Sequence, residues 1–568
     1  MKCNTILKTK CAKQKALLLL FYFLFGVFYA QEPVEVIYHK SEKDKGNEPV
    51  ATLVLFNDIT YLSKMNDKTL SFIDYKMEAI VDMLKYKGNY FKTMESFESL
   101  TEPVMQDETE EIFGYECKKA VYKSFSNTIE VWYTNKAPAK GSPYKNYLPK
   151  NSLVLKIKIN GSLRMIVTDI REISRNKDLF YPTDQAKEIT KPKFRELQIK
   201  SKYVTIPVFD KQQINFDTDI KTGNLNELNK TFRCSNGTVI LKKIVLPKIN
   251  KEGASIFATL TNWSNGDAYD RTCSLFTISN GKEKSVLDAF KDGIKELPVF
   301  KDNQGQEFQG VISTSDYEVP IELMRFFTSF GVSHFNKKRE INNYKWRDSV
   351  VYKQEITNLI PNTEDEIWIG VFIGNYDKGG HKVSLDLNFY PSWTKTTSKN
   401  KYINPLFSTV NILEMSGQNY GKMFKTDTLE TKFELAKNIE NLQLLFTSTG
   451  HGGWGGGDEF NPRLNKIFID GKLVFSEVPW RTDCATYRLS NPASGNFSNG
   501  LSSSDLSRSN WCPATITPPK FIPLDYLKPG NHTIQVVIDQ GDDEGSSFNH
   551  WGVTGVLTGQ ISILKNQD

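Results

Sequence analysis

The stretch Ala254–Ile278 reads ASIFATLTNWSNGDAYDRTCSLFTI and contains two apolar runs that are separated by a polar loop. The runs ASIFATLTNW and CSLFTI have the length of ordinary strands and are rich in β-branched and aromatic residues. The loop between them contains Asn, Gly and Asp, which favour turns. This stretch therefore predicts two β-strands, with Asp270 and Arg271 at the entry of the second one.

The same texture continues to the end of the chain. The runs GTVILKKIVLP and KVSLDLNFY precede about Lys399, and NKIFIDGKLVFSEV and GNHTIQVVIDQG follow it. Only SVLDAFKDGI has the pattern of a short helix. Many short strands with Gly, Pro and Asn turns favour β-sandwiches of jelly-roll type. We expect two such domains, residues 206–396 and 397–568, side by side with a cleft at their junction.

Residues 31–205 have a more regular pattern. Runs such as VEVIYHK, ATLVLF and SLVLKIKI alternate apolar and polar positions, which is typical of a meandering antiparallel sheet. The lysine-rich TDQAKEITKPKFRELQIKSKY that ends this region is interpreted as a linker or lid. The predicted fold class is all-β, with two side-by-side jelly-roll β-sandwiches preceded by a β-rich N-terminal accessory domain.

Residues 1–30 resemble a signal peptide. A basic segment precedes the apolar run ALLLLFYFLFGVFYA, Ala16–Ala30, which has about the length of a signal h-region. Cleavage near Ala30 would give a secreted or periplasmic protein, and a signal anchor is the alternative. No second apolar run is long enough to span a bilayer, so we expect no membrane in the mature form. The net charge is +6, and no basic cluster is present, so we do not expect a nucleic-acid partner. A monomer is expected.

Five cysteines remain after residue 30, and an export route permits disulfides. The favoured pair is Cys484 with Cys512, because the loop between them is polar and could not hold its shape by burial. Closing this loop would stabilise the fold by about 3–4 kcal/mol on the chain-entropy model. Cys234 with Cys273 is a second candidate pair. Free buried thiols are the alternative for both pairs, and the partner of Cys117 stays open.

Three stretches interrupt the strands with reactive side chains. In NWSNGDAYDRTCSLF, Asp270 and Arg271 follow Tyr269, with a loop ion pair as the plain alternative. In GHGGWGGGDEFNPR, Gly450–Arg463, the adjacent acids Asp458 and Glu459 follow a glycine run that would let the backbone approach a ligand, and we expect Asp458 to contact the substrate. A mobile surface hairpin is the alternative for this stretch.

Aromatic residues accompany these charges. Trp454 lies in the glycine run and could stack on a sugar face. In SRSNWCPA, Ser507–Ala514, Arg508 and Trp511 stand next to the proposed disulfide, which would hold them in position. The six histidines are not paired at metal-ligand spacing, so we expect no metal and no cofactor. No Gly-x-Ser-x-Gly elbow or phosphate-binding loop is present.

The motifs AYDR, GWGGGDEFNPR and SRSNWCPA, in this order, resemble the bacterial peptide:N-glycosidase F family over about residues 208–565. The resemblance implies two eight-stranded jelly rolls and hydrolysis of the amide that joins N-acetylglucosamine to an asparagine side chain. The partners would be N-linked glycoproteins and glycopeptides. The N-terminal region resembles the additional bowl-shaped domain of the long form of this family.

The resemblance also assigns site residues. Asp270 takes the position of the essential aspartate, Arg271 that of its neighbouring arginine, and Glu459 that of a second acid on the other jelly roll. Arg508 and Trp511 match substrate-contacting residues near the cleft. We expect Asp270 to activate water and carry its proton to the leaving nitrogen, Glu459 to bind the sugar and help place the water, and the arginines to orient both.

The chain departs from the family pattern at several points. The family brackets its second acid with a short disulfide, where this chain has Gly457 and Asn461, and NWSNGDAYDR lacks the cysteine that precedes the family's aspartate. A third family acid falls near Gly374, and Tyr376 replaces a tryptophan. Its role would be missing or supplied by Asp377 or a residue elsewhere. Glycine at 374 would also leave room beside the innermost sugar, where a core α1,3-linked fucose could fit.

Two other function classes compete with a hydrolase. A non-catalytic glycan-binding protein on the same fold would use Trp454, Trp511, Tyr376 and the glycine loop for sugar binding alone. A structural or adhesive surface protein would be indifferent to substitution of the acids. The enzyme interpretation requires that Asp270 and Glu459 face one solvent-poor groove between the two sandwiches.

Overall fold

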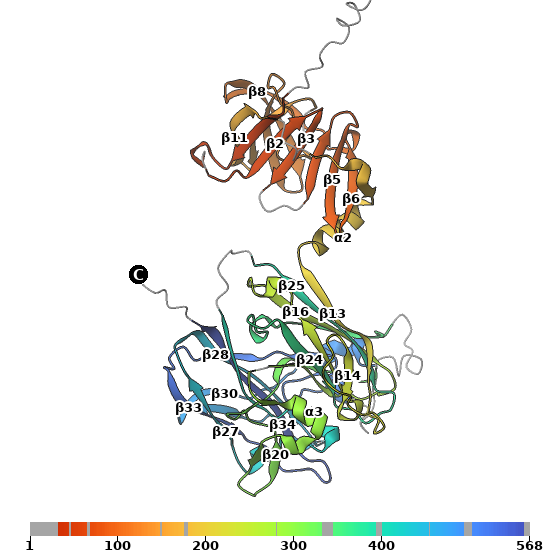
Figure 1. The fold of residues 1–568 in the computed structure, drawn as a ribbon, viewed down its shortest axis with the longest axis vertical. Coiled ribbons are helices and arrows are strands. Elements are labelled where there is room, and N and C mark those ends of the chain that lie inside the picture. Colours follow the sequence, from red (N-terminus) through yellow and green to blue (C-terminus); the bar gives the residue numbers. More distant parts are fainter. Residues whose placement is uncertain are drawn as a thin grey trace, which may run out of the picture. The chain divides into compact units, whose positions relative to one another are not determined.

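The computed structural model describes residues 32–561, except for 45–46, 65–68, 148–149, 175–179, 280, 332–344, 393–399, 454 and 493–501. The chain divides into two compact units, one up to Ser201 and one from Lys202 onward, each considered by itself (Figure 1). No helix among the described residues combines the length and the apolar character needed to cross a bilayer.

The first unit is built on one long sheet. Its strands run almost entirely antiparallel in the order β12-β6-β5-β4-β3-β2-β1-β11-β10-β9-β8-β7. In β1 buried positions alternate with partly exposed ones over its first five residues, as predicted, whereas the first five residues of β10 are all buried. The strands are β1 (Val34–His39), β2 (Ala51–Phe56), β3 (Ile59–Lys64), β4 (Leu70–Asp74), β5 (Ala79–Tyr86), β6 (Asn89–Ser96), β7 (Val104–Ile112), β8 (Tyr115–Ser124), β9 (Asn127–Thr134), β10 (Leu153–Ile159), β11 (Ser162–Glu172) and β12 (Ala186–Glu188).

The segment interpreted as a linker or lid contains a helix, α2 (Lys191–Lys200). A proline in its first turn suits helix initiation, because that position needs no amide donor. Phe194 and Leu197 are buried and pack with Leu84 of β5. This part of the segment is therefore a helix packed on the first unit. Its high lysine content makes the two buried apolar residues hard to recognise in the sequence.

The second unit begins with a β-sandwich of two sheets (yellow and green in Figure 1). In β25, residues 381, 383, 385, 387 and 389 are buried and face its core, as strict alternation requires. One sheet has the order β13 (Val204–Ile214), β25 (His381–Tyr390), β16 (Ser255–Ser264), β23 (Val350–Glu355). The other has the order β14 (Thr231–Cys234), β15 (Val239–Val245), β24 (Glu366–Ile373), β17 (Thr272–Ile278), β22 (Ile321–Phe327), β31 (Ile516–Thr517).

A second sandwich follows (mostly blue in Figure 1). One sheet has the order β26 (Lys401–Ser408), β34 (His550–Ile561), β28 (Ile439–His451), β32 (Lys520–Pro523), and the other β27 (Leu429–Leu435), β33 (Gly530–Ile538), β29 (Asn465–Ile469), β30 (Lys472–Glu477). The predicted helix is α3 (Val286–Asp292), beside the short strand pairs β18 (Lys284–Ser285) with β21 (Tyr317–Glu318) and β19 (Val299–Lys301) with β20 (Glu307–Gln309). The all-β class with two neighbouring jelly-roll sandwiches is confirmed.

The two sandwiches are joined through their cores. Strand β31 lies late in the chain, yet it pairs with β22 of the first sandwich. Arg325 of β22 is fully buried and forms a bidentate ion pair with Glu322, at 2.7 and 2.9 Å. The same guanidinium donates across the seam to Thr449 Oγ1 at 2.8 Å and to the carbonyl of Gly552 at 3.0 Å. Because a buried charge without its partners is costly, these bonds fix how the sandwiches meet.

Candidate active site

Asp270 lies in the loop between β16 and β17, and the backbone on both sides of it is held by one residue. Thr328, which follows β22 and is fully buried, accepts a hydrogen bond from the Arg271 amide at 2.7 Å on its hydroxyl. The same hydroxyl donates to the carbonyl of Tyr269 at 2.8 Å. The Thr328 amide in turn donates to the Arg271 carbonyl. These hydrogen bonds fix the backbone on both sides of Asp270, although the residue belongs to a loop.

Arg271 does not form the local ion pair with Asp270 that the sequence left open. Its guanidinium binds Asp267 instead, with Nε to Oδ2 at 2.7 Å, and His381 lies 3.4 Å from the same carboxylate. Burial by itself would raise the pKa of Asp267, but the nearby His381 ring and the hydrogen-bonded Arg271 guanidinium outweigh it and lower this pKa to about 2. Sequence reasoning missed Asp267, whose role depends on the folded loop.

Arg508 brings the two predicted acids together across the seam. Its Nη1 donates to Asp270 Oδ2 at 3.0 Å and to Glu459 Oε1 at 2.7 Å. Its side chain is fully buried, whereas those of Asp270 and Glu459 are 18% and 20% exposed. Nη2 donates to the carbonyl of Ser503 at 2.6 Å. One buried cation therefore serves two partly accessible carboxylates, one from each sandwich.

The environment of Glu459 favours its protonated form. Burial raises its pKa to about 7; the Arg508 guanidinium opposes this rise, and the charge of Asp270 adds to it. A carboxyl group that titrates near neutrality in a shared pair is typical of functional sites. Two acids with one cation can hold one proton between them, which suits proton transfer.

Trp511 has a different place from the one predicted. It is only 3% exposed and stacks on Phe327 with ring centroids 4.4 Å apart. The Arg508 guanidinium lies 4.3 Å from the Trp511 ring centre, and the indole N–H donates to the Gly450 carbonyl. Trp511 therefore supports Arg508 from beneath by a cation–π contact rather than presenting a face to a substrate. The reason is the β31–β22 pairing, which draws this loop into the seam.

The predicted disulfide between Cys484 and Cys512 is confirmed, with Cα atoms 5.2 Å apart. It ties the loop of Arg508 to the short 3-10 helix that begins at Cys484. Cys234 and Cys273 are separate buried thiols, so that second pairing was wrong, and Cys117 is also free. Among the described residues, one cluster has the composition of a metal site, Asp483 with Cys484 and Cys512, and its sulfurs are already tied in the disulfide.

The glycine run before Glu459 folds onto itself. A Cβ atom at Gly457 would lie 1.9 Å from the Gly452 carbonyl oxygen, and one at Gly453 would lie 2.3 Å from the Gly457 Cα. Gly452 and Gly453 also have positive φ angles of 105° and 72°. Within the described part of this loop, the glycines are needed for close approach of the backbone to itself. Trp454, the predicted sugar platform, lies outside the described residues.

Asp458 is a structural acid, not the substrate contact that we predicted. Its side chain is fully buried and accepts hydrogen bonds from Arg463 Nε at 2.7 Å and Trp551 Nε1 at 2.8 Å. The amide of Gly541 donates to both of its carboxylate oxygens. Of the two adjacent acids, Glu459 binds the shared Arg508, whereas Asp458 binds Arg463.

A carboxylate that the sequence did not reveal lies beside Gly374. A Cβ at 374 would lie 3.3 Å from Oε2 of Glu414, a residue of the 3-10 helix η8 (Glu414–Ser416). Tyr376 and Tyr420 both donate their hydroxyls to Glu414 Oε1. Asp377 instead caps a turn by accepting from the amides of Gly379 and Gly380. Glu414 therefore supplies a carboxylate beside Gly374, and room for a core fucose at this position stays a prediction.

An exposed aromatic rim adjoins the acids. Tyr269 and Tyr376 are 59% and 57% exposed. The Arg271 guanidinium lies 5.0 Å from the Tyr269 ring centre and 5.5 Å from that of Tyr376. Burial raises the pKa of Tyr376 to about 12, and the bond to Glu414 adds to the rise, so its hydroxyl remains a donor. This rim offers apolar ring faces next to charged and hydroxyl groups, the combination that suits sugar rings.

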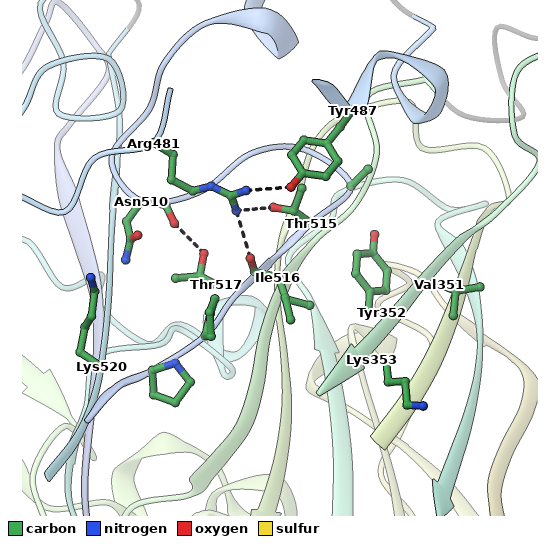
Figure 2. Close-up of a pocket in the computed structure, with 13 residues that line it drawn as sticks. Val351, Tyr352, Lys353, Arg481, Tyr487, Asn510, Thr515, Ile516, Thr517 and Lys520 are labelled. Carbon is green, nitrogen blue, oxygen red and sulfur yellow. Dashed lines mark hydrogen bonds between the residues drawn. The ribbon is translucent and has the colours of Figure 1, made fainter. Parts of the chain in front are cut away.

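A cavity of about 660 Å³ lies elsewhere on the seam (Figure 2). Residues of β23, including Tyr352, line one side, and the segment that follows Arg508 lines the other. Arg481 lies in it with its guanidinium bound to Thr515 and the Ile516 carbonyl. No carboxylate lines this cavity, so the chemistry of the acids belongs to the Arg508 site.

Known proteins give a consistent comparison. Family models match at residues 205–389 (Peptide-N-glycosidase F, N terminal), 419–558 (Peptide-N-glycosidase F, C terminal) and 53–195 (N-glycanase peptide, N-terminal domain). A solved structure of PNGF-II in space group P21 is 42% identical, with 94% of this chain and 100% of that chain covered and a TM-score of 0.80. A second, in space group C2, is 41% identical with the same coverage and a TM-score of 0.77. No curated protein matched.

These matches extend over both units and agree with the motifs that meet at Arg508. The identity of 42% holds over nearly the whole chain, a level at which fold and family membership are shared. The chain belongs to the peptide:N-glycosidase F family, in the form that carries an additional N-terminal domain.

Proposed function

We propose that this chain is a secreted peptide:N-glycosidase that hydrolyses the amide between N-acetylglucosamine and an asparagine side chain of glycoproteins and glycopeptides. It releases the intact glycan and leaves aspartate in the peptide. The observation that carries the proposal is the bridge of Asp270 and Glu459 by Arg508 across the two sandwiches. Family membership supports the same reaction, and the apolar N-terminal segment supports export.

Asp270 is the base of this reaction. An amide is a weak electrophile, so the attacking water needs a base and the amide nitrogen needs a proton before it leaves. Asp270 accepts a proton from water as the water oxygen bonds to the carbonyl carbon. It then gives this proton to the nitrogen as the carbon–nitrogen bond breaks. The products are a carboxylic acid on the peptide and a glycosylamine, and no redox partner is required.

Arg508 and Glu459 set the charge around Asp270. Arg508 keeps Asp270 oriented and offers positive charge where the carbonyl oxygen becomes negative. Ionised Glu459 accepts hydrogen bonds from sugar hydroxyls and from the attacking water.

A direct test is mass spectrometry of a defined glycopeptide incubated with the protein. Hydrolysis converts the glycosylated asparagine to aspartate, whereas binding alone leaves the glycopeptide intact. A glycan-binding protein on this fold, the second candidate, would retain the glycopeptide on a column without changing its mass. An intact glycopeptide after long incubation with folded protein would refute the hydrolase proposal.

We expect kcat/KM for glycopeptide hydrolysis to fall as the pH drops through about 7. Burial and the charge of Asp270 raise the pKa of Glu459 to about 7 against the opposing effect of Arg508, so Glu459 is ionised above this pH and protonated below it. Protonation removes an acceptor for the sugar and the water. The profile of kcat/KM reports groups of the free enzyme. In Glu459→Gln the fall of kcat/KM below about pH 7 should disappear, and much of the rate should be lost. The same fall at the same pH in this variant would contradict the assignment to Glu459.

Glu414 is expected to bind the sugar. Its Oε1 is occupied by the Tyr376 and Tyr420 hydroxyls, while Oε2 lies beside Gly374. Glu414→Gln should raise KM about tenfold, because a hydrogen bond to a charged group is lost, while kcat changes much less. Glu430→Gln, at an exposed position of β27, is the matched control. A fall in kcat at constant KM would instead place Glu414 in the chemical step.

A further inference from the structure

The loop that carries Glu459 is held by side chains in place of a covalent crosslink. Asn461, at one of the two positions where the family pattern has cysteine, donates its amide to the carbonyls of Gly455 at 2.9 Å and Gly457 at 2.8 Å. These bonds close the turn around Glu459 from its C-terminal side. They leave the N-terminal half of the loop, with its glycines, to be held by other groups.

Glu544 holds that half. Its Oε2 accepts hydrogen bonds from two nearby amides of the loop, Gly456 at 2.9 Å and Gly455 at 3.1 Å. Consecutive amides that point at one oxygen form an anion-binding concavity. A Cβ at Gly453 would lie 2.9 Å from the same oxygen, so the carboxylate of the exposed Glu544 lies directly against the loop. Charge-assisted bonds of this kind are stronger than neutral ones.

The position of Glu544 is itself fixed by a tight hairpin. The amides of Glu544 and Ser547 each donate to the other's carbonyl at 2.9 Å, and Gly545 between them has a φ angle of 60°. Ser547 adds a third anchor, because its hydroxyl accepts from the Gly453 amide at 2.9 Å. This hairpin precedes β34, so it is tied to the sandwich that carries the loop.

The anchored backbone leads directly to the acid. The Glu459 amide donates to the Gly452 carbonyl, and the Glu459 carbonyl accepts from the Ser509 amide, next to Arg508. A displacement of residues 452–457 would therefore move Glu459 relative to Arg508 and Asp270. Glycine gives this loop many alternative backbone conformations, so its anchors decide which of them is populated.

We propose that Glu544 is a positioning residue for Glu459, and that its carboxylate does the work of a crosslink on the glycine loop. The role rests on the proposed hydrolase function, because it concerns the geometry of that reaction. The Gly455 and Gly456 amides are exposed, so water replaces the carboxylate when it is removed and the fold persists. Removing the Glu544 carboxylate therefore changes the position of Glu459 and not the fold.

The test compares Glu544→Ala, Glu544→Gln and the matched control Asp542→Ala. Asp542 lies two residues before Glu544, and its side chain pairs with Lys425. Among the described hydrogen bonds and ion pairs, this side chain makes none to the glycine loop. We expect Glu544→Ala to lower kcat about tenfold to a hundredfold with a much smaller change in KM, since a small misplacement of a reacting group is costly. Glu544→Gln, which keeps an acceptor oxygen, should recover most of the rate, and Asp542→Ala should match the wild type.

Two further readouts separate positioning from a general loss of stability. Amide hydrogen exchange in a peptide spanning residues 450–460 should rise in Glu544→Ala and not in Asp542→Ala, while Tm stays near the wild-type value. Wild-type kcat and unchanged exchange in Glu544→Ala would overturn the proposal. If the wild type itself releases no glycan, the hydrolase function fails, and the exchange data still decide whether Glu544 anchors the loop.

Discussion

Replacing Asp270 by asparagine is expected to lower kcat for glycan release by about 10⁴-fold, the upper range for loss of a general base. Asparagine has the same shape, and its side-chain oxygen still accepts from Arg508 Nη1, which is 3.0 Å from Asp270 Oδ2 in the wild type. It cannot take a proton from water. The measurement is the rate of conversion of a glycopeptide to its aspartate product, followed by mass spectrometry at several pH values.

The control for this substitution is Asp210→Asn. Asp210 is an exposed acid of the same sandwich and lies on β13. It should keep the wild-type rate, and both variants should keep the wild-type Tm. Turnover of Asp270→Asn within about tenfold of the wild type would reject Asp270 as the base, since that is far less than such a group contributes.

Replacing Arg508 by methionine is expected to lower kcat about 10²- to 10³-fold, the range seen when a stabilising donor of a developing charge is removed. The two acids would then face each other without their shared cation. Arg508 now lowers the pKa of Glu459 against burial and Asp270, so its loss should move the acid limb of any residual activity to higher pH. Kinetics over a wide pH range measure both effects.

A second substitution at 508 tests whether the positive charge alone, or also the planar shape of the guanidinium, is needed for the rate. Lysine at 508 keeps the charge but has one point-like donor group, so Arg508→Lys should recover only part of the rate. Arg488→Met is the matched control, because Arg488 pairs with Asp505 in the same region and does not reach either acid in the described contacts. A pH limb that stays in place in Arg508→Met would show that Arg508 does not set the charge of Glu459.

Much of the fold could be predicted because it depends on local pattern. Alternation of apolar and polar residues predicted the strands, and the pattern of SVLDAFKDGI predicted the short helix α3. The structure adds that Ser285 and Asp288 close this helix with a capping box. The polar loop between Cys484 and Cys512 pointed to their disulfide. Helix α2 was missed because high lysine content hides the two apolar residues, Phe194 and Leu197, that dock it.

The site was predictable only where it depends on short motifs. Asp270, Glu459 and Arg508 stand in such motifs, and the structure brings all three together. Glu414 was missed because it lies in no motif. It belongs to a chain segment about forty residues after Gly374, beside which its carboxylate lies. Trp511 and Asp458 look like surface groups in the sequence, yet both are buried, because burial is set by strands far away in the chain.

The amino-acid sequence by itself determined the all-β class and the sandwiches, which follow from local patterns of apolar residues, and the disulfide, which follows from the polar loop between its cysteines. The paired acids were identified from short motifs through their resemblance to a family. Only the tertiary structure decided that Asp267 holds Arg271, that Glu414 lies beside Gly374, and that Glu544 anchors the glycine loop. The physical reason is that a hydrogen bond acts over about 3 Å. Its partners must be adjacent in space, and pairing of distant strands is what makes them so.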